Sequence, residues 1–400
     1  METFRGNFTQ QEPIPEEAIA AAVEVMRSGR LHRYNTAPGE AGEVALLEQE
    51  FAALVGAKYC LAVASGGYAM GAALRAAGVG PGDAVLSNTF TLAPVPGAIA
   101  AIGAKPIFVE VTPDLTIDLD DLEAKADQAG TLLLSHMRGH ICDMDRLMAI
   151  CDAAGITVIE DCAHTMGAAW RGTPSGRHGA AGCYSTQTYK HVNSGEGGFI
   201  VSDDAELMAK AILLSGSYML YDRHLAAPGP EVFEAVRYTT PNVSGRMDHL
   251  RAAILRPQLA RLSEQVAAWN DRYRAVEEGL QHQPGLTVID RPKDEAYVGS
   301  SIQFLLQDWG DDDIRMLLSR CAARGVELKW FGAPEPAAFT STYDHWHFAA
   351  PTPLPRSDRI LHSIIDMRLP LTFSLADCAQ IARIIRAEVG AVYQGRAAAE

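Results

Sequence analysis

Several features that would assign this 400-residue chain to other classes of protein are missing from its sequence. The seven cysteines show no CxxC spacing, so the sequence indicates neither a zinc ribbon nor a disulfide framework, and we expect reduced thiols. The formal net charge of -15 contrasts with the basic excess of proteins that bind nucleic acid. The first residues lack a basic segment followed by an apolar one, so no signal peptide is expected. We therefore expect a cytoplasmic protein without a nucleic-acid partner.

Membrane, nucleotide and metal motifs are missing as well. The longest notable uncharged stretch, residues 84–104, contains Pro94, Pro96 and Gly97, which argues against a membrane helix. No GxGxxG occurs and glycine is never followed by lysine, so neither a dinucleotide fingerprint nor a Walker loop is present. The histidines of HMRGH (136–140) lie four residues apart, but this motif lacks the glutamate of HExxH and contains a glycine. The sequence thus predicts neither a membrane partner nor a metal site.

The sequence does contain a regular alternation of short apolar runs and helical patterns. Strands are predicted at residues 59–65, 84–88, 105–111, 130–136, 156–161, 183–189 and 197–203, and helical patterns occupy most of the intervals. This alternation predicts an α/β fold with a mainly parallel, doubly wound sheet, in which ligands bind at the carboxyl ends of the strands. A long helical region follows at 246–280 and is expected to kink at Pro257.

The pattern changes beyond Pro284. Strand-like and helical runs there predict a smaller α+β domain, with strands near 286–290, 300–307 and 326–330 and helices near 311–324 and 374–390. We therefore expect three parts: an N-terminal arm (1–35), a large cofactor-binding domain (36–260) and a small C-terminal domain (261–400).

Polar residues lie at the predicted carboxyl ends of the strands. Ser65-Gly66-Gly67 is expected to begin a helix, where free backbone N–H groups and the helix dipole favour an anion. Taken alone, this motif fits a plain strand-to-helix turn better. Asp161 ends another apolar strand and could alternatively cap a helix. Ser185 precedes Lys190 by five residues, and a single lysine is ordinarily a surface residue. Together, an anion site, an acid and a lysine are what pyridoxal phosphate requires, and Phe90 is available to stack on its ring.

These segments resemble those of the DegT/StrS-type sugar aminotransferases, which are fold-type I pyridoxal-phosphate enzymes. The likeness extends over about residues 12–390. VIEDCAHTMGA (158–168) resembles the family's acid motif, and YSTQTYKHVNSGEGGFIVSDD (184–204) resembles its lysine motif. The resemblance implies a seven-stranded, aspartate-aminotransferase-like large domain and a pyridoxal 5'-phosphate cofactor.

The resemblance also implies roles for individual residues. Lys190 would form the Schiff base with the cofactor and carry the proton to and from the substrate α-carbon, and Asp161 would keep the pyridine nitrogen protonated. His164 would contact the phenolic oxygen of the cofactor. Ser185 and the backbone of Gly66 and Gly67 would bind its phosphate. Phe90 would stack on its ring.

The chain differs from the family's usual sequence at several positions. Gly66-Gly67 replaces the usual Gly-Thr, and Thr188-Tyr189 replaces the usual Pro-Thr before the lysine. Where the family has an asparagine that reaches the cofactor of the neighbouring subunit, this chain has Ser244, with Asn242 two residues earlier. Either residue could serve, or neither. The resemblance implies a homodimer with its active sites at the interface.

The substrates implied by the resemblance are an amino-acid donor, L-glutamate or L-glutamine, and a keto acceptor such as a keto sugar or keto cyclitol, used in turn by a ping-pong course. The acceptor pocket is expected to draw on residues 31–40, 217–245 and 328–336, with the candidates Tyr34, Tyr218, Lys329, Trp330 and Phe331. Cations for a nucleotide diphosphate could come from Arg30, Arg33 and Lys329.

Two alternatives to an aminotransferase remain open. One is a pyridoxal-phosphate dehydratase, epimerase or other lyase on the same fold, and the other is a non-catalytic regulatory relative. Family members that act as dehydratases replace the lysine with histidine, so Lys190 favours amino transfer, although His191 follows it. The presence of Lys190, Asp161 and Ser185 together counts against a purely regulatory protein.

Overall fold

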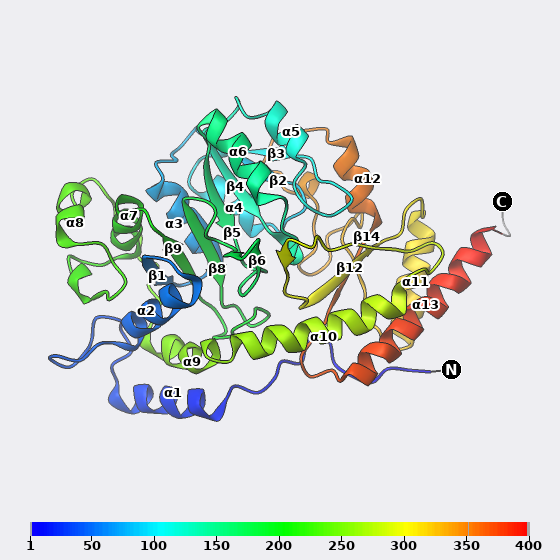
Figure 1. Ribbon diagram of the computed structural model, residues 1–400, viewed down its shortest axis with the longest axis horizontal. Helices are drawn as coiled ribbons and strands as arrows, with labels where there is room; N and C mark the ends of the chain where they lie inside the picture. Colours follow the sequence, from blue (N-terminus) through cyan, green and yellow to red (C-terminus); the bar gives the residue numbers. More distant parts are fainter. Residues whose placement is uncertain (1, 351, 398–400) are drawn as a thin grey trace.

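A seven-stranded sheet forms the centre of the larger part of the molecule in the computed structural model, which describes residues 2–350 and 352–397 (Figure 1). The strand order is β1-β9-β8-β5-β4-β2-β3, and β9 alone among these strands runs antiparallel to its neighbours. The strands are β1 (Tyr59–Val63), β2 (Ala84–Asn88), β3 (Lys105–Val109), β4 (Thr131–Ser135), β5 (Thr157–Asp161), β8 (Ala181–Ser185) and β9 (Gly198–Ser202). The predicted α/β fold with a mainly parallel sheet is confirmed.

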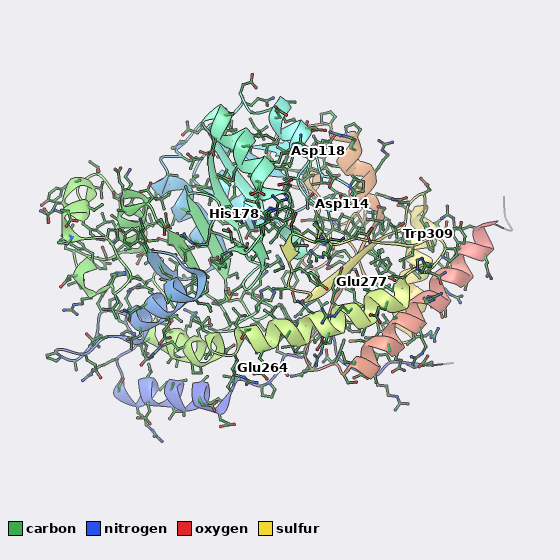
Figure 2. The ribbon with its side chains drawn as sticks, in the orientation of Figure 1. Asp114, Asp118, His178, Glu264, Glu277 and Trp309 are labelled. Carbon is green, nitrogen blue, oxygen red and sulfur yellow. The ribbon has the colours of Figure 1, made fainter. Side chains whose placement is uncertain are left out.

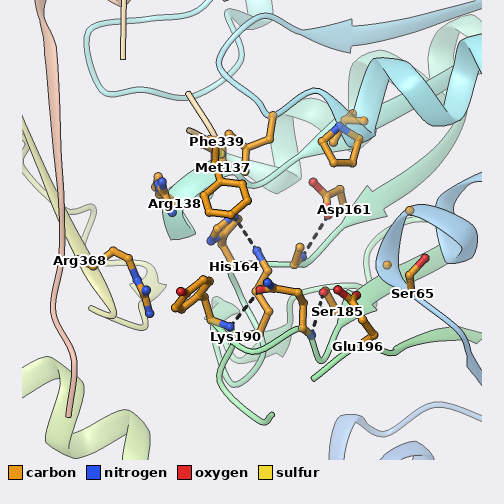
Figure 3. A pocket seen from close by; sticks show the side chains of 18 of the residues that line it. Ser65, Met137, Arg138, Asp161, His164, Ser185, Lys190, Glu196, Phe339 and Arg368 are labelled. Atoms are coloured by element: carbon orange, nitrogen blue, oxygen red, sulfur yellow. Dashed lines mark hydrogen bonds between the residues drawn. The ribbon is translucent and has the colours of Figure 1, made fainter. Parts of the chain in front are cut away.

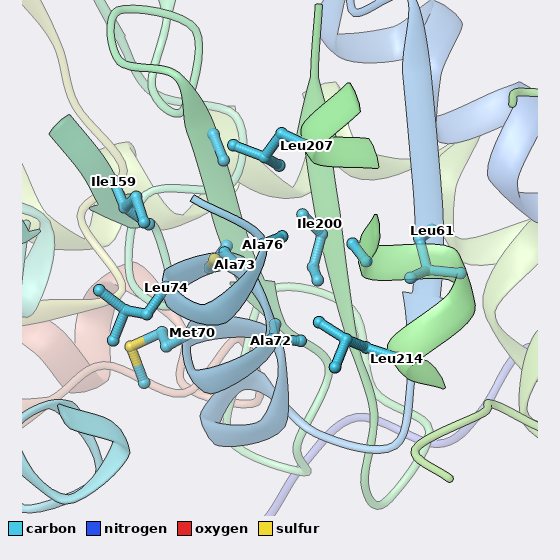
Figure 4. Close-up of a cluster of buried hydrophobic side chains, with 14 of the residues drawn as sticks. Leu61, Met70, Ala72, Ala73, Leu74, Ala76, Ile159, Ile200, Leu207 and Leu214 are labelled. Carbon is cyan, nitrogen blue, oxygen red and sulfur yellow. The ribbon is translucent and has the colours of Figure 1, made fainter. Parts of the chain in front are cut away.

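Helices cover both faces of this sheet, as a doubly wound fold requires. One face carries α3 (Gly66–Ala76), α4 (Pro94–Ala101), α7 (Ala205–Ser215) and α8 (Pro230–Val236). The other carries α2 (Glu43–Val55), α5 (Leu119–Ala124), α6 (Met144–Ala154) and α9 (His249–Leu259). Successive strand residues point to opposite faces: Leu61 packs in the first core with Met70 and Leu74 of α3 (Figure 4), whereas Ala62 packs in the second.

Two consecutive helices, α9 and α10 (Leu262–Leu280), connect this sheet to the rest of the molecule (Figure 1). Pro257 lies inside α9, which ends two residues later at Leu259. Proline removes an intrahelical hydrogen bond and its ring crowds the preceding turn, which weakens a helix. The predicted kink is realised as a break at residues 260–261, where the predicted domain boundary also falls.

A second, smaller sheet has the order β10-β12-β14-β13 and is antiparallel throughout. Its strands are β10 (Thr287–Val288), β12 (Ser301–Leu305), β13 (Lys329–Trp330) and β14 (Ile364–Arg368), and its core also contains residues of α10, α11 (Asp311–Ala323) and α13 (Leu375–Ala397). Trp309 belongs to this core and lies near α13 (Figure 2), where Arg396 approaches its ring. The sequence did not predict β14, because it follows α12 (Pro355–Ser363) with no turn residue between them.

The first residues of the chain belong to this second core as well. Phe4 and Phe8 pack edge-on against Phe373, with ring centroids 5.0 and 4.9 Å apart. Helix α1 (Glu16–Ser28) then lies against α9. The N-terminal arm thus contacts both parts of the molecule, and the predicted division into 1–35, 36–260 and 261–400 stays a prediction.

Short elements complete the description. They are β6 (Ala169–Trp170), β7 (Thr173–Pro174), β11 (Glu295–Ala296), η1 (Met137–Gly139), η2 (Tyr221–Arg223) and η3 (Tyr343–His345). Within the described residues, every helix is too short or too polar to serve as a membrane span.

A buried ion-pair network fixes the chain that precedes α2. The Glu48 carboxylate accepts hydrogen bonds from Arg33 Nη1 and Nη2, each at 2.9 Å, and from the backbone N–H of Ala62 at 2.8 Å. His224 Nδ1 lies 3.2 Å from the same carboxylate, and its Nε2 lies 2.9 Å from the Tyr34 hydroxyl. Burial alone would raise the pKa of Glu48, but Arg33 and His224 lower it to about 2. The network therefore joins the arm, α2 and β1 through an ionised carboxylate.

Replacing Glu48 with Gln should lower the free energy of unfolding by about 3–5 kcal/mol, because the buried Arg33 loses its counter-charge. Urea unfolding followed by circular dichroism measures this change. Since the pKa of Glu48 is depressed, its contribution is present above about pH 4.5 and is lost as the pH falls toward 2, a loss that Glu48→Gln should lack. Glu24→Gln, which breaks an exposed pair with Arg27, is the control and should stay within about 1 kcal/mol of wild type. Equal effects of the two substitutions would contradict this account.

Candidate active site

A cavity of about 450 Å³ opens at the carboxyl ends of the parallel strands, and residues of both sheets line it. The residues predicted at strand ends meet here: Ser65–Gly67, Asp161, His164, Ser185 and Lys190 all contribute to the lining. The pairing of neighbouring strands brings them together. Strands β5 and β8 run parallel with Asp161 opposite Cys183, so that Ser185 emerges at the same edge of the sheet.

The loop 186–197 positions Lys190. The Thr186 N–H donates to the Gly197 carbonyl at 2.9 Å, and the Ser194 N–H donates to the Thr186 carbonyl at 3.0 Å. Gly197 has a φ of 150°, and a Cβ there would lie 2.3 Å from Thr186 Oγ1, so a side chain does not fit. This closed loop is also the reason why β8 ends at Ser185, although the sequence predicted a strand to residue 189.

The Lys190 amine is held in an environment that favours its neutral form. Burial is the main cause, Arg138 and Arg368 add to it, and Asp161 opposes it, so that the pKa of Lys190 falls to about 7. Its Nζ lies 3.1 Å from His164 Nε2. Burial and the charge on Lys190 lower the pKa of His164 well below its usual range, so the imidazole is neutral and can accept a hydrogen bond from the amine. A large fraction of Lys190 is therefore an uncharged nucleophile at neutral pH.

Asp161 provides a buried carboxylate, which lies on the other side of the Lys190 amine from Arg138 in the view of Figure 3. Its Oδ2 accepts a hydrogen bond from Ser135 Oγ at 2.9 Å, and its Oδ1 accepts one from the Ala163 N–H at 3.1 Å. Burial nevertheless raises the pKa of Asp161, against the effect of these donors and of Lys190. A protonated ring nitrogen placed beside this carboxylate would lower its pKa again, because opposite charges favour ionisation.

The first turn of α3 suits an anion. Ser65 Oγ accepts the Tyr68 N–H at 3.1 Å and caps the helix, whose dipole and free N–H groups favour negative charge. A Cβ on Gly66 would lie 2.9 Å from Ser185 Cβ, whereas one on Gly67 would meet only Ser65 Oγ, at 4.0 Å. The open space at Gly67 leaves room for a phosphate, and the adjacent Gly66 lies against Ser185. With the buried carboxylate and the amine, the residues present fit pyridoxal phosphate.

The structure does not support the expected position of Phe90. Its ring is fully buried and is not part of the cavity lining. It packs edge-on against Phe331, at a centroid distance of 4.9 Å, in an apolar cluster beneath the cavity. The lining from the same segment consists of Leu92, Pro94 and Val95. Phe90 and Phe331 are core residues because each fills the apolar space beside the other.

Four of the five substrate candidates also lie outside the lining, and Phe331, packed against Phe90, is one of them. Tyr34 is 6% exposed and is part of the buried network around Glu48. Tyr218 is 61% exposed and is not part of the cavity lining, and Trp330 is buried in the second core. These aromatic residues lie within the segments predicted to form the acceptor pocket, but Tyr34 and Trp330 pack in the interior and Tyr218 lies on the surface. Lys329 is the candidate that does line the cavity.

The other sequence candidates have different surroundings. Arg30 pairs with Glu40 at 3.1 Å on the surface, and Arg33 is taken up by the buried network, so neither faces the cavity. Asn242 and Ser244 are exposed and lie outside the lining. Whether they reach a neighbouring subunit stays a prediction.

Two arginines that line the cavity, Arg138 and Arg368, were not predicted from the sequence. Arg138 lies shortly after β4, which ends at Ser135, so the strand-end rule that selected Asp161 could have found it, but its motif was compared only with zinc-binding motifs. Arg368 ends β14, a strand that the sequence did not predict.

A separate buried cluster of His136, Glu160 and Cys162 has the residue types of a metal site. The Glu160 carboxylate, however, accepts the backbone N–H groups of residues 176, 178 and 179, each at 2.8 Å, and lies 3.0 Å from His136 Nε2. Its lone pairs are already used, so we regard Glu160 as an anchor for the turn that precedes β8.

The titration of Lys190 provides a test of this electrostatic description. Competitive acetylation of cofactor-free protein, followed by mass spectrometry and normalised to unfolded protein, should give a midpoint near pH 7 for this amine. Arg138→Gln should raise the midpoint because it removes a positive charge, and Asp161→Asn should lower it because it removes a negative one. A wild-type midpoint near the ordinary lysine value of about 10.4 would refute the description.

Residues 13–387 match the DegT/DnrJ/EryC1/StrS aminotransferase family. The pleiotropic regulatory protein of Geobacillus stearothermophilus is 34% identical over 64% of this chain and 65% of its own length. L-glutamine:scyllo-inosose aminotransferase of Streptomyces griseus is 32% identical over 63% of this chain and 60% of its own. UDP-2-acetamido-2-deoxy-3-oxo-D-glucuronate aminotransferase of Pseudomonas aeruginosa is 34% identical over 64% of this chain and 67% of its own. The match thus spans about two thirds or slightly less of the length of these relatives.

The fold has a close counterpart among solved structures. The crystal structure of 3-amino-5-hydroxybenzoic acid synthase superimposes with a TM-score of 0.82 and 24% identity, covering 98% of this chain and 99% of that one. The shared fold agrees with the sequence match, which extends over nearly the whole chain. The chain therefore belongs to the DegT/DnrJ/EryC1/StrS aminotransferase family of pyridoxal-phosphate-dependent enzymes.

Proposed function

We propose that this chain transfers an amino group from an α-amino acid, L-glutamate or L-glutamine, to a keto acceptor such as a keto sugar or keto cyclitol, in two half-reactions at one site. The observation that carries this proposal is the position of the Lys190 amine, with a pKa near 7, in one cavity with the buried Asp161 and the anion-binding start of α3. The names of two relatives, which act on scyllo-inosose and on a UDP-linked 3-oxo sugar acid, support this acceptor class.

The lining residues would divide the work around the cofactor. When bound, pyridoxal phosphate supplies a ring that delocalises the electron pair left by loss of the substrate α-proton. Lys190 would hold the cofactor and, once released by the donor, would accept the α-proton and return it, a task for which a pKa near the working pH is best. Asp161 would keep the ring nitrogen protonated. Ser185 and the backbone N–H groups of Gly66 and Gly67 would bind the phosphate.

Two further contacts to the cofactor complete the proposal. His164, neutral and 3.1 Å from the Lys190 amine, would face the phenolic oxygen. Leu92 and Val95, which line the cavity, would take the place beside the ring that the sequence had assigned to Phe90.

We also propose a homodimer that resides in the cytoplasm. Ser244 has a φ of 59°, and its N–H donates to Asn242 Oδ1 at 3.1 Å, so the pair forms a fixed, exposed turn that could reach a neighbouring subunit. All seven cysteines are buried and unpaired, which supports a reducing compartment.

Replacing Lys190 with Ala should lower amino transfer at least about 100-fold, because both the attachment point and the general base are lost. The measurement is 2-oxoglutarate formed from L-glutamate in the presence of keto acceptors. Lys105→Ala, an exposed lysine at the start of β3, is the control and should leave the rate unchanged.

Two outcomes would overturn the proposal. Full activity of Lys190→Ala would show that this amine is not needed. Loss of water from a keto sugar without any amino transfer by the wild type would instead assign the site to a dehydratase.

A further inference from the structure

The two residues that flank Lys190 in the sequence both reach the smaller sheet. The Tyr189 ring lies against the Arg368 guanidinium of β14, whose central carbon is 3.9 Å from the ring centroid. His191 Nε2 lies 3.1 Å from the Oγ of Ser300, the residue before β12. Lys190 itself belongs to a loop that follows β8 of the larger sheet. The loop that carries Lys190 is therefore in contact with the wall that the smaller sheet contributes to the cavity.

Ser300 is a fixed point of the smaller sheet. Its carbonyl accepts the backbone N–H of the residue after Arg368 at 3.0 Å, and the next residue, Ser301, is paired with Arg368 across β12 and β14. The far end of the loop is held by the larger part of the molecule. The Asn193 N–H donates to Gln258 Oε1 of α9, and Gln258 Nε2 donates to the Asn193 carbonyl, each at 2.9 Å. The loop is thus attached to both parts of the molecule.

His191 lines a second, smaller cavity of about 70 Å³. Tyr189, Lys190 and Arg368 line both cavities and so separate them, whereas His191 lines the smaller one alone. Because the loop borders open space on two sides, close packing is not sufficient to hold it in place. His191 does not face a substrate in the larger cavity, so its influence on the reaction would pass through its neighbour Lys190.

The burial of the imidazole has a cost that packing does not explain. His191 is 4% exposed, and its ring packs edge-on against Trp269 of α10 at a centroid distance of 5.2 Å. Its Nδ1 is buried without a hydrogen-bond partner among the described residues. A buried nitrogen of this kind is unfavourable, and an apolar side chain would pack against Trp269 without that cost. The contact of Nε2 with Ser300 is what an apolar side chain could not supply.

We propose that His191 is a positioning residue, whose contact with Ser300 holds the Lys190 amine at a fixed distance from the wall supplied by the smaller sheet. This inference rests on the proposed function. Proton transfer requires the amine to lie within hydrogen-bond reach of the reacting atom, and a small displacement lowers the rate strongly. Burial and the charge on Arg368 lower the pKa of Lys190, so the same contact also keeps the amine largely neutral.

The titration of Lys190 in cofactor-free protein tests this contact separately from the reaction. Competitive acetylation should give His191→Leu a midpoint at least about half a pH unit above wild type, because the loop moves away from Arg368 and water reaches the amine. His191 does not titrate in this range, since burial and the charge on Lys190 lower its pKa to about 3. Ser300→Ala should give the same shift, and the double variant should add little to it, because both substitutions remove one contact.

Two further variants separate the contact from a general loss of stability. The amide nitrogen of His191→Gln can replace Nε2 and donate to Ser300, so the midpoint should return toward the wild-type value. The matched control is His249→Leu. His249 is 3% exposed, its Nδ1 accepts the Val44 N–H at 3.4 Å, and its Nε2 is buried without a partner among the described residues, but it lines neither cavity. Whatever its effect on stability, this control should leave the Lys190 midpoint unchanged.

The reaction itself should slow while the site stays filled. His191→Leu should lower the rate of 2-oxoglutarate formation from L-glutamate about 10-fold, because the amine is displaced. It should still bind a full equivalent of pyridoxal phosphate, since the residues proposed for the phosphate and the ring nitrogen are unchanged. Absorbance of the isolated protein measures the bound cofactor.

Failure of this inference can be distinguished from failure of the proposed function. If His191→Leu and Ser300→Ala both keep the wild-type midpoint, the contact does not position the amine and the inference is refuted, while amino transfer by the wild type would still support the proposed function. A shift in His191→Leu without one in Ser300→Ala would also refute it, because the imidazole would then act by packing alone. If the wild type transfers no amino group, the proposed function fails, and an equal shift in the two variants would still support the contact.

Discussion

The neutral amine of Lys190 depends on its burial beside positive charge, and the chemistry of the cavity depends on that amine. A lysine in water is protonated at neutral pH and cannot act as a nucleophile or a base. Here burial and the charges of Arg138 and Arg368 lower its pKa to about 7, although Asp161 acts in the opposite direction. The closed loop 186–197 keeps the amine in this position. The same positive charges that favour the neutral amine would attract an anionic substrate to it, so one arrangement serves both activation and binding.

The cavity needs both sheets. The parallel strands of the larger sheet bring Asp161 and Ser185 to one edge through the pairing of β5 with β8. The smaller sheet contributes Lys329 and Arg368 from β13 and β14. Helices α9 and α10 and the N-terminal arm connect the two parts, and the ionised Glu48 holds the arm against α2 and β1.

The sequence predicted the larger sheet and the residues at its strand ends, because apolar runs, glycine turns and polar strand termini are local signals. It did not predict β14, since this strand follows α12 without a turn, and Arg368 was missed for that reason. Phe90 and Tyr34 were assigned to the cavity because they belong to segments that were expected to border the cofactor or the acceptor. The direction of a side chain, however, depends on packing partners distant in sequence. Phe331 and Glu48 are those partners. Tertiary contacts of this kind leave no mark on local sequence patterns.

The proposed function requires that Lys190 hold the cofactor in this cavity. The most direct measurement is reduction of the pyridoxal-phosphate-loaded protein with borohydride, followed by peptide mapping with mass spectrometry. The added mass of the reduced cofactor should lie on the peptide that contains Lys190, and L-glutamate added before reduction should remove this label. Label on another lysine, or none at all on a protein that has bound the cofactor, would contradict the proposed function.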